Sequence, residues 1–139
     1  MLEKIRSELL TPFGLRTLAP DDPSYRGRYA GDVISRDRAY HNGSAYPWLL
    51  GPFITALIRT HGKGHSTRRA AQEILAAPIR YMQTIGLGQL CELFDGDKPH
   101  NPGGAIASAR SVAEILRCYV EDVIEPPITP MPDPHRAVV

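Results

Sequence analysis

Two long segments without helical periodicity constrain how this chain of 139 residues can fold. Residues 15–44 and 86–104 are punctuated by glycine and proline, and neither places apolar residues at helical spacing. Loops of this length are unusual inside a compact domain unless they carry function. We therefore expect the flanking segments to form the core, and the two loops to carry any site.

The remaining chain has four segments with a helical pattern of apolar residues. We expect helices over residues 1–10, 46–61, about 66–85 and about 105–123. Gly51-Pro52 could kink the second of these, Pro78 could bend the third, and Ser66 or Thr67 could cap the third. The last should bury Ile106, Val112, Ile115, Leu116 and Tyr119. No convincing strand pairing is visible, so the expected fold class is all-α.

Composition limits the classes of partner and the number of domains. The formal net charge is +1, with 42% hydrophobic and 22% charged residues, which is ordinary for one soluble globular domain. This balance argues against nucleic acid or an anionic membrane as a partner, and no apolar run is long enough to span a membrane. Two cysteines without a signal-like start indicate the cytoplasm. We expect one domain over 1–124 and a disordered, proline-rich tail over 125–139.

Two motifs that suggest metal or phosphate binding fail on inspection. His61 and His65 are separated by glycines that break the helix needed to align them, so a surface turn is favoured over a zinc site. Gly62-Lys63, followed by Ser66-Thr67, lacks the upstream glycine and the preceding strand of a phosphate loop. We expect no metal and no cofactor.

The stretch from Tyr40 to Phe53 has an unusual mixture of residues. It places His41, Tyr46 and Trp48 among glycine, serine and proline. Glycine and proline weaken helix interiors, and a buried tryptophan needs a partner for its N–H group. We interpret this stretch as a site loop that leads into a buried helix.

Glu92 is the most informative residue of the second loop. It lies within the apolar run Leu90–Phe94, just before the turn Asp95-Gly96-Asp97. It could be a glutamate that points to solvent from a short extended segment. Equally, it could be a carboxylate held in a cleft, where its surroundings tune it for general acid or base chemistry. The local sequence leaves both interpretations open.

A series of motifs resembles one known family. In chain order, they are Gly14-Leu15-Arg16-Thr17-Leu18, Asp21-Asp22-Pro23, Tyr25-Arg26-Gly27-Arg28-Tyr29, Ser35-Arg36-Asp37, Tyr40-His41-Asn42-Gly43, Pro47-Trp48-Leu49-Leu50-Gly51-Pro52-Phe53, Glu92-Leu93-Phe94-Asp95-Gly96-Asp97 and Ser111-Val112-Ala113-Glu114-Ile115-Leu116. Together they resemble the C-terminal part of the glucosidase domain of glycogen debranching enzymes, in its bacterial and archaeal form. The resemblance covers roughly residues 10–120.

The resemblance implies a fold, a substrate and a reaction. The fold would be a partial α/α toroid, the last few helices of a six-hairpin barrel. The family hydrolyses the α-1,6-linked glucose at a trimmed branch of glycogen, a branched α-glucan, with inversion, which needs two carboxyl groups on either side of the sugar. Glu92 matches the general base. The general acid lies upstream in the family, in sequence that this chain does not contain.

The resemblance also implies substrate contacts. His41, Tyr46 and Trp48 match positions that line the cleft, where an aromatic ring can stack on a sugar. The alternative for Trp48 is a core residue. Arg16 could reach the site, or it could form an ion pair with Asp21, Asp22 or Asp37.

Some departures from the family pattern support a second hypothesis. Tyr46 stands where the family usually has tryptophan, and Ala107-Ser108-Ala109-Arg110-Ser111 stands where it has Ala-Gln-Ala-Trp-Ser. The first hypothesis is a fragment of a debranching glucosidase that is inactive without an upstream polypeptide. The second is a non-catalytic module that binds glucan or a protein partner. Exposed apolar faces of a partial toroid would favour self-association or partner binding in either case.

Overall fold

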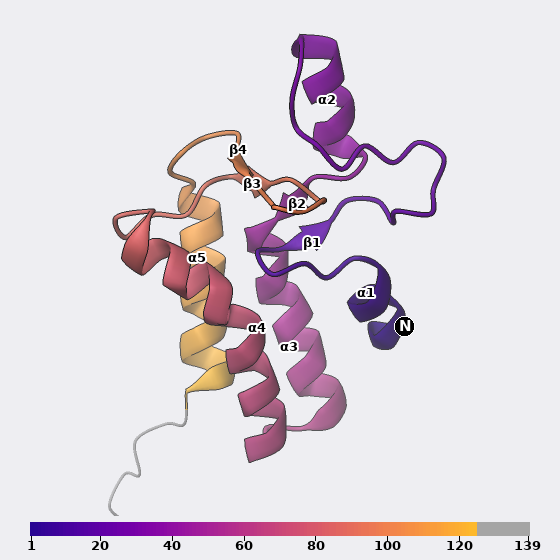
Figure 1. The fold of residues 1–139 in the computed structure, drawn as a ribbon. Coiled ribbons are helices and arrows are strands. Elements are labelled where there is room, and N and C mark those ends of the chain that lie inside the picture. The colour runs from indigo at the N-terminus through magenta and orange to yellow at the C-terminus, as the bar shows by residue number, and fades with distance from the viewer. Residues whose placement is uncertain (125–139) are drawn as a thin grey trace, which may run out of the picture.

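The computed structural model of this protein describes residues 1–124, and its helices and strands are shown in Figure 1. In chain order, the elements are α1 (Leu2–Glu8), β1 (Leu15–Arg16), α2 (Val33–His41), β2 (Ala45–Tyr46), a 3₁₀ turn η1 (Pro47–Leu49), α3 (Leu50–His61), α4 (His65–Thr84), β3 (Leu93–Phe94), β4 (Pro102–Gly103), α5 (Ala109–Cys118) and a π-helical turn η2 (Tyr119–Val123). The tail that we expected to be disordered, residues 125–139, lies outside the described residues.

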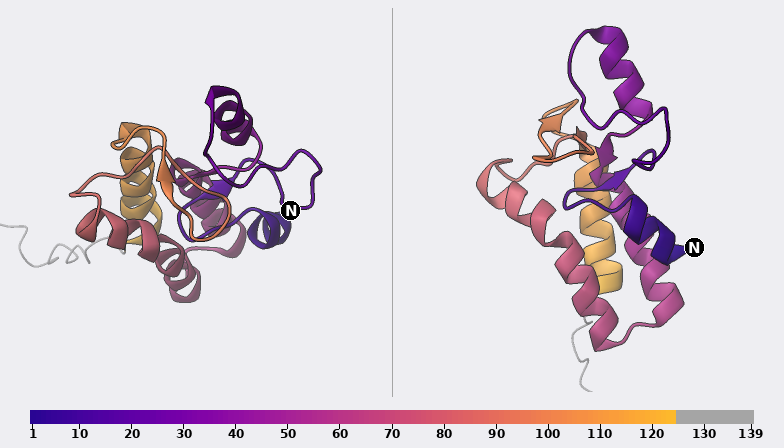
Figure 2. Two further views of the ribbon diagram at one scale, coloured as in Figure 1. Left: turned by 45° about the horizontal axis from the view of Figure 1, so that its top comes forward. Right: turned by 45° about the vertical axis from the view of Figure 1, so that its right-hand side comes forward.

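The core lies between α3, α4 and α5, which pack side by side (Figures 1 and 2). Leu50 and Ile54 of α3, Leu75 of α4 and Ile115 of α5 are almost fully buried. Burying side chains of this size supplies most of the free energy that holds such helices together. Apolar residues of the short α1 cover part of this core. The helix expected over 66–85 is therefore confirmed, and that expected over 46–61 is confirmed from Leu50 onward, since Tyr46 lies in β2 and residues 47–49 form the 3₁₀ turn.

A small antiparallel sheet connects the two long loops, and it corrects the all-α expectation. Its strand order is β1-β2-β3-β4, with Leu15 opposite Tyr46, Ala45 opposite Phe94 and Leu93 opposite Gly103. Each strand has two residues, which is too short to show the alternation of apolar and polar residues that reveals a strand in a sequence. The sheet places the residues after α2 beside the residues after Glu92.

Helix α2 lies inside the segment that we expected to have no helix. Its N-cap Asp32 accepts a hydrogen bond from the backbone N–H of Ser35 at 2.8 Å. Ala39 is its one buried residue, and Val33 and Ile34 are exposed. Figure 2 shows the helix standing away from the α3–α5 layer. Because α2 buries no apolar stripe, the sequence carried no helical period to detect.

Neither predicted proline distortion interrupts a helix. Pro52 lies in the first turn of α3, where backbone N–H groups have no helical partner, and α4 continues through the buried Pro78. Gly62, with a φ of 82°, follows the end of α3. The N-cap of α4 is Gly64, so Ser66 and Thr67 lie inside the helix rather than at its cap.

Helix α5 begins four residues later than expected. Ser108 is its N-cap, and its hydroxyl accepts a hydrogen bond from the N–H of Ser111. Ile106 is therefore in the preceding loop and is 88% exposed, and Leu116 is 60% exposed on the outer face. Both were wrongly predicted to be buried. Ile115 is buried, and Val112 and Tyr119 are partly buried against the core.

A polar cluster fixes α5 against α3. Arg117 of α5 forms an ion pair with Glu114 at 2.9 Å, and it donates a hydrogen bond to the hydroxyl of Thr55 on α3. The Thr55 hydroxyl in turn donates to Asp122 at 2.7 Å. These contacts hold the second half of α5 and η2 against α3. Within residues 1–124, no helix combines the length and hydrophobicity needed to cross a membrane.

Candidate functional site

Glu92 is fixed by two hydrogen bonds just before β3. Its Oε1 accepts from the Tyr40 hydroxyl at 2.6 Å, and its Oε2 accepts from the backbone N–H of Ala105 at 3.0 Å. The hydrogen bond from Tyr40, that from Ala105 and the nearby charge of Arg110 lower the pKa of Glu92. The side chain is partly buried. It is thus a held, ionised carboxylate rather than a free surface glutamate.

Tyr40 connects this carboxylate to the aromatic residues of the first loop. Its backbone carbonyl accepts a hydrogen bond from the Tyr46 hydroxyl at 3.1 Å. Its ring packs edge-on against the rings of Tyr46 and His41, with centroids 5.3 and 5.1 Å away. The hydrogen bond to the Glu92 carboxylate raises the pKa of Tyr40, because ionisation of the phenol would remove the donor. Sequence reasoning overlooked Tyr40, although it begins the motif that contains His41.

A pocket of about 230 Å³ gathers three of the predicted site residues. Its lining consists of Thr17, Tyr40, His41, Tyr46, Trp48, Leu49 and Arg110. Glu92 is not part of the lining, but the Tyr40 hydroxyl joins it to the pocket. The pocket is therefore formed by the residue after β1, the end of α2, β2, η1 and the start of α5, and the second loop meets it through Glu92.

The aromatic residues of the pocket differ in what they offer to a ligand. Tyr46 is 5% exposed, and burial raises the pKa of its hydroxyl, so it mainly supports Tyr40. Trp48 is only partly buried and lies outside the hydrophobic core cluster. The guanidinium carbon of Arg110 lies 5.0 Å from the centroid of the Trp48 ring, in a cation–π contact. His41 is exposed at the end of α2.

Arg16 lies apart from this pocket. Its Nε donates to the carbonyl of Gly96 at 3.0 Å, and a terminal nitrogen donates to the carbonyl of Glu8 at 3.2 Å. The ion pair expected with Asp21, Asp22 or Asp37 is not formed among the described residues. Arg16 thus connects the end of α1 to the loop that follows β3.

The other acidic residues after Glu92 hold the loop in shape. Asp95 accepts from the backbone N–H of Tyr29 at 2.7 Å and from the side chain of Asn101 at 3.0 Å. Asp97 accepts from the hydroxyl of Tyr25 at 2.8 Å. Gly104, with a φ of 67°, packs against Glu92, and a Cβ there would lie 2.6 Å from its Oε2. Of the three acidic residues Glu92, Asp95 and Asp97, Glu92 is the one hydrogen-bonded to a residue that lines the pocket.

Two further kinds of chemistry find little support. Burial raises the pKa of the Cys91 thiol to about 11, so a thiolate nucleophile beside Glu92 is disfavoured. Among residues 1–124, no group of three or more histidine, cysteine or acidic side chains is placed to hold a metal ion. His61 and His65 lie at the end of α3 and the start of α4, and both are exposed.

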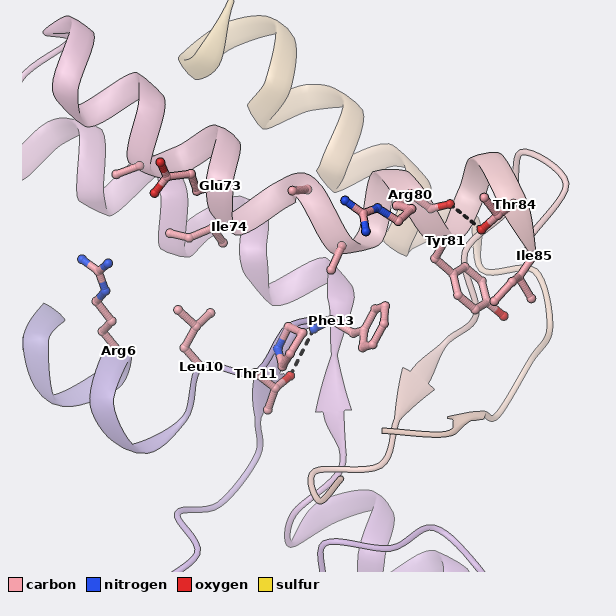
Figure 3. A pocket seen from close by; sticks show the side chains of 14 residues that line it. Arg6, Leu10, Thr11, Phe13, Glu73, Ile74, Arg80, Tyr81, Thr84 and Ile85 are labelled. Atoms are coloured by element: carbon pink, nitrogen blue, oxygen red, sulfur yellow. Dashed lines mark hydrogen bonds between the residues drawn. The ribbon is translucent and has the colours of Figure 1, made fainter. Parts of the chain in front are cut away.

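A larger groove lies between α1 and α4, and none of the predicted site residues lines it. It has a volume of about 660 Å³ and is lined mainly by aliphatic and aromatic groups, including Leu10, Phe13 and Ile74 (Figure 3). Its one acidic lining residue, Glu73, pairs with Arg69 at 3.3 Å. The largest cavity is the usual first candidate for a site, but this groove lacks a held carboxylate. We therefore place the candidate site at the smaller pocket.

Comparison with known proteins identifies the family. The sequence model of amylo-alpha-1,6-glucosidase matches residues 1–117. The chain belongs to the amylo-alpha-1,6-glucosidase family. It is also similar to the glycogen debranching enzyme of Saccharomyces cerevisiae, with 38% identity over an alignment of 58 residues; the match covers 37% of this chain and 4% of the yeast protein. The resemblance seen in the sequence is confirmed, and it places the chain in a glycoside hydrolase family. The chain spans a small part of the yeast enzyme's length.

Proposed function

We propose that this chain is the C-terminal part of an inverting debranching α-1,6-glucosidase, with Glu92 as its general base. The observation that carries the proposal is the carboxylate of Glu92, which two hydrogen bonds hold in its ionised form beside the Trp48 pocket. A general base must be deprotonated before it can accept a proton, and a lowered pKa meets this condition. The family and the pocket together favour a sugar as the substrate.

In the proposed reaction, Glu92 removes a proton from a water molecule, and the water oxygen attacks the anomeric carbon of the terminal glucose. An acid on the other side of the sugar protonates the departing glycosidic oxygen. Each Glu92 oxygen accepts one hydrogen bond from the protein, and each has a second lone pair for a water molecule. Tyr40 acts as a positioning residue, because its hydroxyl fixes the carboxylate without touching the reacting atoms.

The pocket beside Glu92 is proposed to bind one sugar unit of a branched α-glucan. Trp48 presents a partly exposed ring, and the exposed His41 can hydrogen-bond to a sugar hydroxyl. Tyr46 is assigned a supporting role, because its ring is buried and its hydroxyl binds Tyr40. Arg16 contributes only through the Gly96 loop.

The site is proposed to be incomplete without further polypeptide. The pocket lining contains no carboxyl group that could serve as the acid. A base without its acid loses a rate factor of about 10²–10⁴. We propose that the helices form part of an α/α toroid in the cytoplasm. The groove between α1 and α4 would then pack against an upstream polypeptide or, in its absence, against a second copy.

A complementation assay tests this proposal. The chain is mixed with the upstream part of a glucosidase domain, and glucose release from branched dextrin is measured. The expected result is release by the mixture and none by either part alone. Release that persists at full rate in the Glu92→Gln variant would overturn the assignment of the base.

A non-catalytic glucan-binding module is the second candidate. Ser108 and Arg110 favour it, because Ser108 serves as the cap of α5 and Arg110 covers the ring of Trp48. Calorimetry measures whether the chain binds a maltooligosaccharide, which both the glucosidase and the glucan-binding module should do. Binding without glucose release in the complemented mixture would support the module, and absence of binding would count against it.

A further inference from the structure

Arg110 lies at the edge of the candidate pocket and forms no ion pair within residues 1–124, although its charge acts on Glu92 from a distance. It is exposed in the first turn of α5, and its guanidinium group lies over the Trp48 ring. Within residues 1–124, no carboxylate oxygen lies close enough to it to form an ion pair. Stacking occupies the face of a guanidinium group and leaves its in-plane N–H donors free. Arg110 is therefore arranged to receive an anion.

The rest of the pocket offers two further free donors, the Thr17 hydroxyl and the Trp48 indole N–H, beside two tyrosine hydroxyls whose hydrogens are already used. The Tyr40 and Tyr46 hydroxyls already donate to Glu92 and to a backbone carbonyl, and Thr17 accepts from the N–H of Gly43. The Trp48 indole N–H makes no hydrogen bond to the described part of the chain, and no carboxylate is among the lining residues. A pocket with free donors and a free cation favours a ligand rich in acceptor oxygens.

We propose that this pocket binds a sugar that carries a phosphate monoester, with the phosphate on Arg110 and the sugar ring against Trp48. The proposal rests on the carbohydrate function proposed above and specifies its ligand class. A guanidinium fork matches the oxygens of a phosphate in a bidentate manner. The phosphate could belong to a free sugar phosphate or to a phosphorylated glucan chain, since both present the same group.

Calorimetry on the 139-residue chain tests this inference with four probes: glucose, glucose 6-phosphate, phosphorylated maltotriose and inorganic phosphate. Glucose 6-phosphate should bind about tenfold more tightly than glucose, the gain expected for charge-assisted hydrogen bonds. Arg110→Gln should abolish that gain, and Arg110→Lys should retain part of it. The control is Arg59→Gln, an exposed arginine in the last turn of α3, which should leave binding unchanged.

The outcomes distinguish this inference from the function on which it rests. Equal affinity for glucose and glucose 6-phosphate, with both lost in Trp48→Ala, would overturn the phosphate inference and leave the carbohydrate pocket intact. Binding of no sugar at all would overturn both. Inorganic phosphate that binds as tightly as glucose 6-phosphate would overturn the role of the sugar ring. Tighter binding of phosphorylated maltotriose than of glucose 6-phosphate would support the inference with a glucan chain as the source, and equal binding would support it with a free sugar phosphate.

Discussion

Two hollows of this molecule, the groove between α1 and α4 and the pocket beside Glu92, differ in both size and construction. The groove between α1 and α4 is the larger, at about 660 Å³ against about 230 Å³, and its walls are mainly apolar side chains on two helices. The pocket beside Glu92 is small, but hydrogen bonds connect its residues across three segments of the chain. Size alone therefore does not locate the candidate site, which we place where a carboxylate is held by hydrogen bonds.

The sharpest contrast comes from replacing the glutamate at each place. In the complemented enzyme, Glu92→Gln should lower the rate of glucose release by about 10²–10⁴, because the amide cannot accept the proton. Glu73→Gln, in the groove, should leave that rate unchanged, since Glu73 pairs only with Arg69 at the surface. A similar loss in both variants would contradict the assignment of chemistry to the smaller pocket.

Tyr40→Phe removes one of the two hydrogen bonds that hold the Glu92 carboxylate, and it leaves the carboxylate itself in place. Loss of the hydrogen bond raises the pKa of Glu92, so the acid limb of the pH–rate profile should move to higher pH. The rate should fall less than in Glu92→Gln. Tyr29→Phe is the matched control, because the Tyr29 hydroxyl makes no hydrogen bond within residues 1–124.

Tyr40→Phe should also change the stability of the protein in a pH-dependent way. The folded-state pKa of Glu92 is lowered, so its contribution to stability is present above the unfolded-state pKa and is lost as pH falls through the folded-state pKa. The difference in free energy of unfolding between wild type and Tyr40→Phe should thus be widest near neutral pH and should narrow in acid. Denaturant unfolding at several pH values measures it, and a constant difference would contradict the linkage.

A pair of glycine variants tests the packing around Glu92. Gly104 and Gly88 both have positive φ, at 67° and 82°, but only Gly104 would place a Cβ against Glu92. Both alanine variants suffer backbone strain. The difference in stability between them therefore isolates the contact between the new Cβ at position 104 and Glu92. Gly104→Ala should be less stable than Gly88→Ala by roughly 1 kcal/mol, as expected for overpacking. Thermal unfolding measures this difference, and equal losses would show that the carboxylate moves aside freely.

The smallest effect on the pocket beside Glu92 should come from placing a charged side chain in the groove between α1 and α4. We expect the isolated chain to self-associate, and Ala76→Glu, at an exposed groove position on α4, should weaken that association. Gln72→Glu, on the same helix outside the groove lining, should not weaken it. Sedimentation of the wild-type chain as a monomer at all concentrations would contradict the expected association. Sugar binding should be unchanged in both variants.

The sequence predicted those elements that bury an apolar stripe. Helices α3 and α4 were placed closely, because buried residues recur at helical spacing within each: Leu50 and Ile54 in α3, and Ala71, Leu75 and Pro78 in α4. Helix α2 was missed since it buries only Ala39, and the sheet was missed since its strands have two residues each. The start of α5 was misplaced because the Ser108 cap outweighs the helix-forming residues before it.

The family resemblance, rather than residue type alone, singled out most of the residues that meet at the candidate site. His41, Tyr46 and Trp48 do line one pocket, and Glu92 lies one hydrogen bond from it. The role of Tyr40 was not visible, because its partner is 52 positions away in the sequence. Arg110 was noted only as a departure from the family pattern, since a cation–π contact across η1 and α5 depends on how the helices pack.

The four-stranded sheet has a consequence for how the pocket forms. Its strands join residues near positions 15, 45, 94 and 103, so every loop that contributes to the pocket is closed by pairing between distant parts of the chain. Such pairing has high contact order, because its partners are far apart in the sequence. Closing the intervening loops costs conformational entropy, which the strand contacts offset only after the loops have closed. The pocket should therefore be among the last parts to form during folding, and the first to be lost when a protease cuts any of these loops.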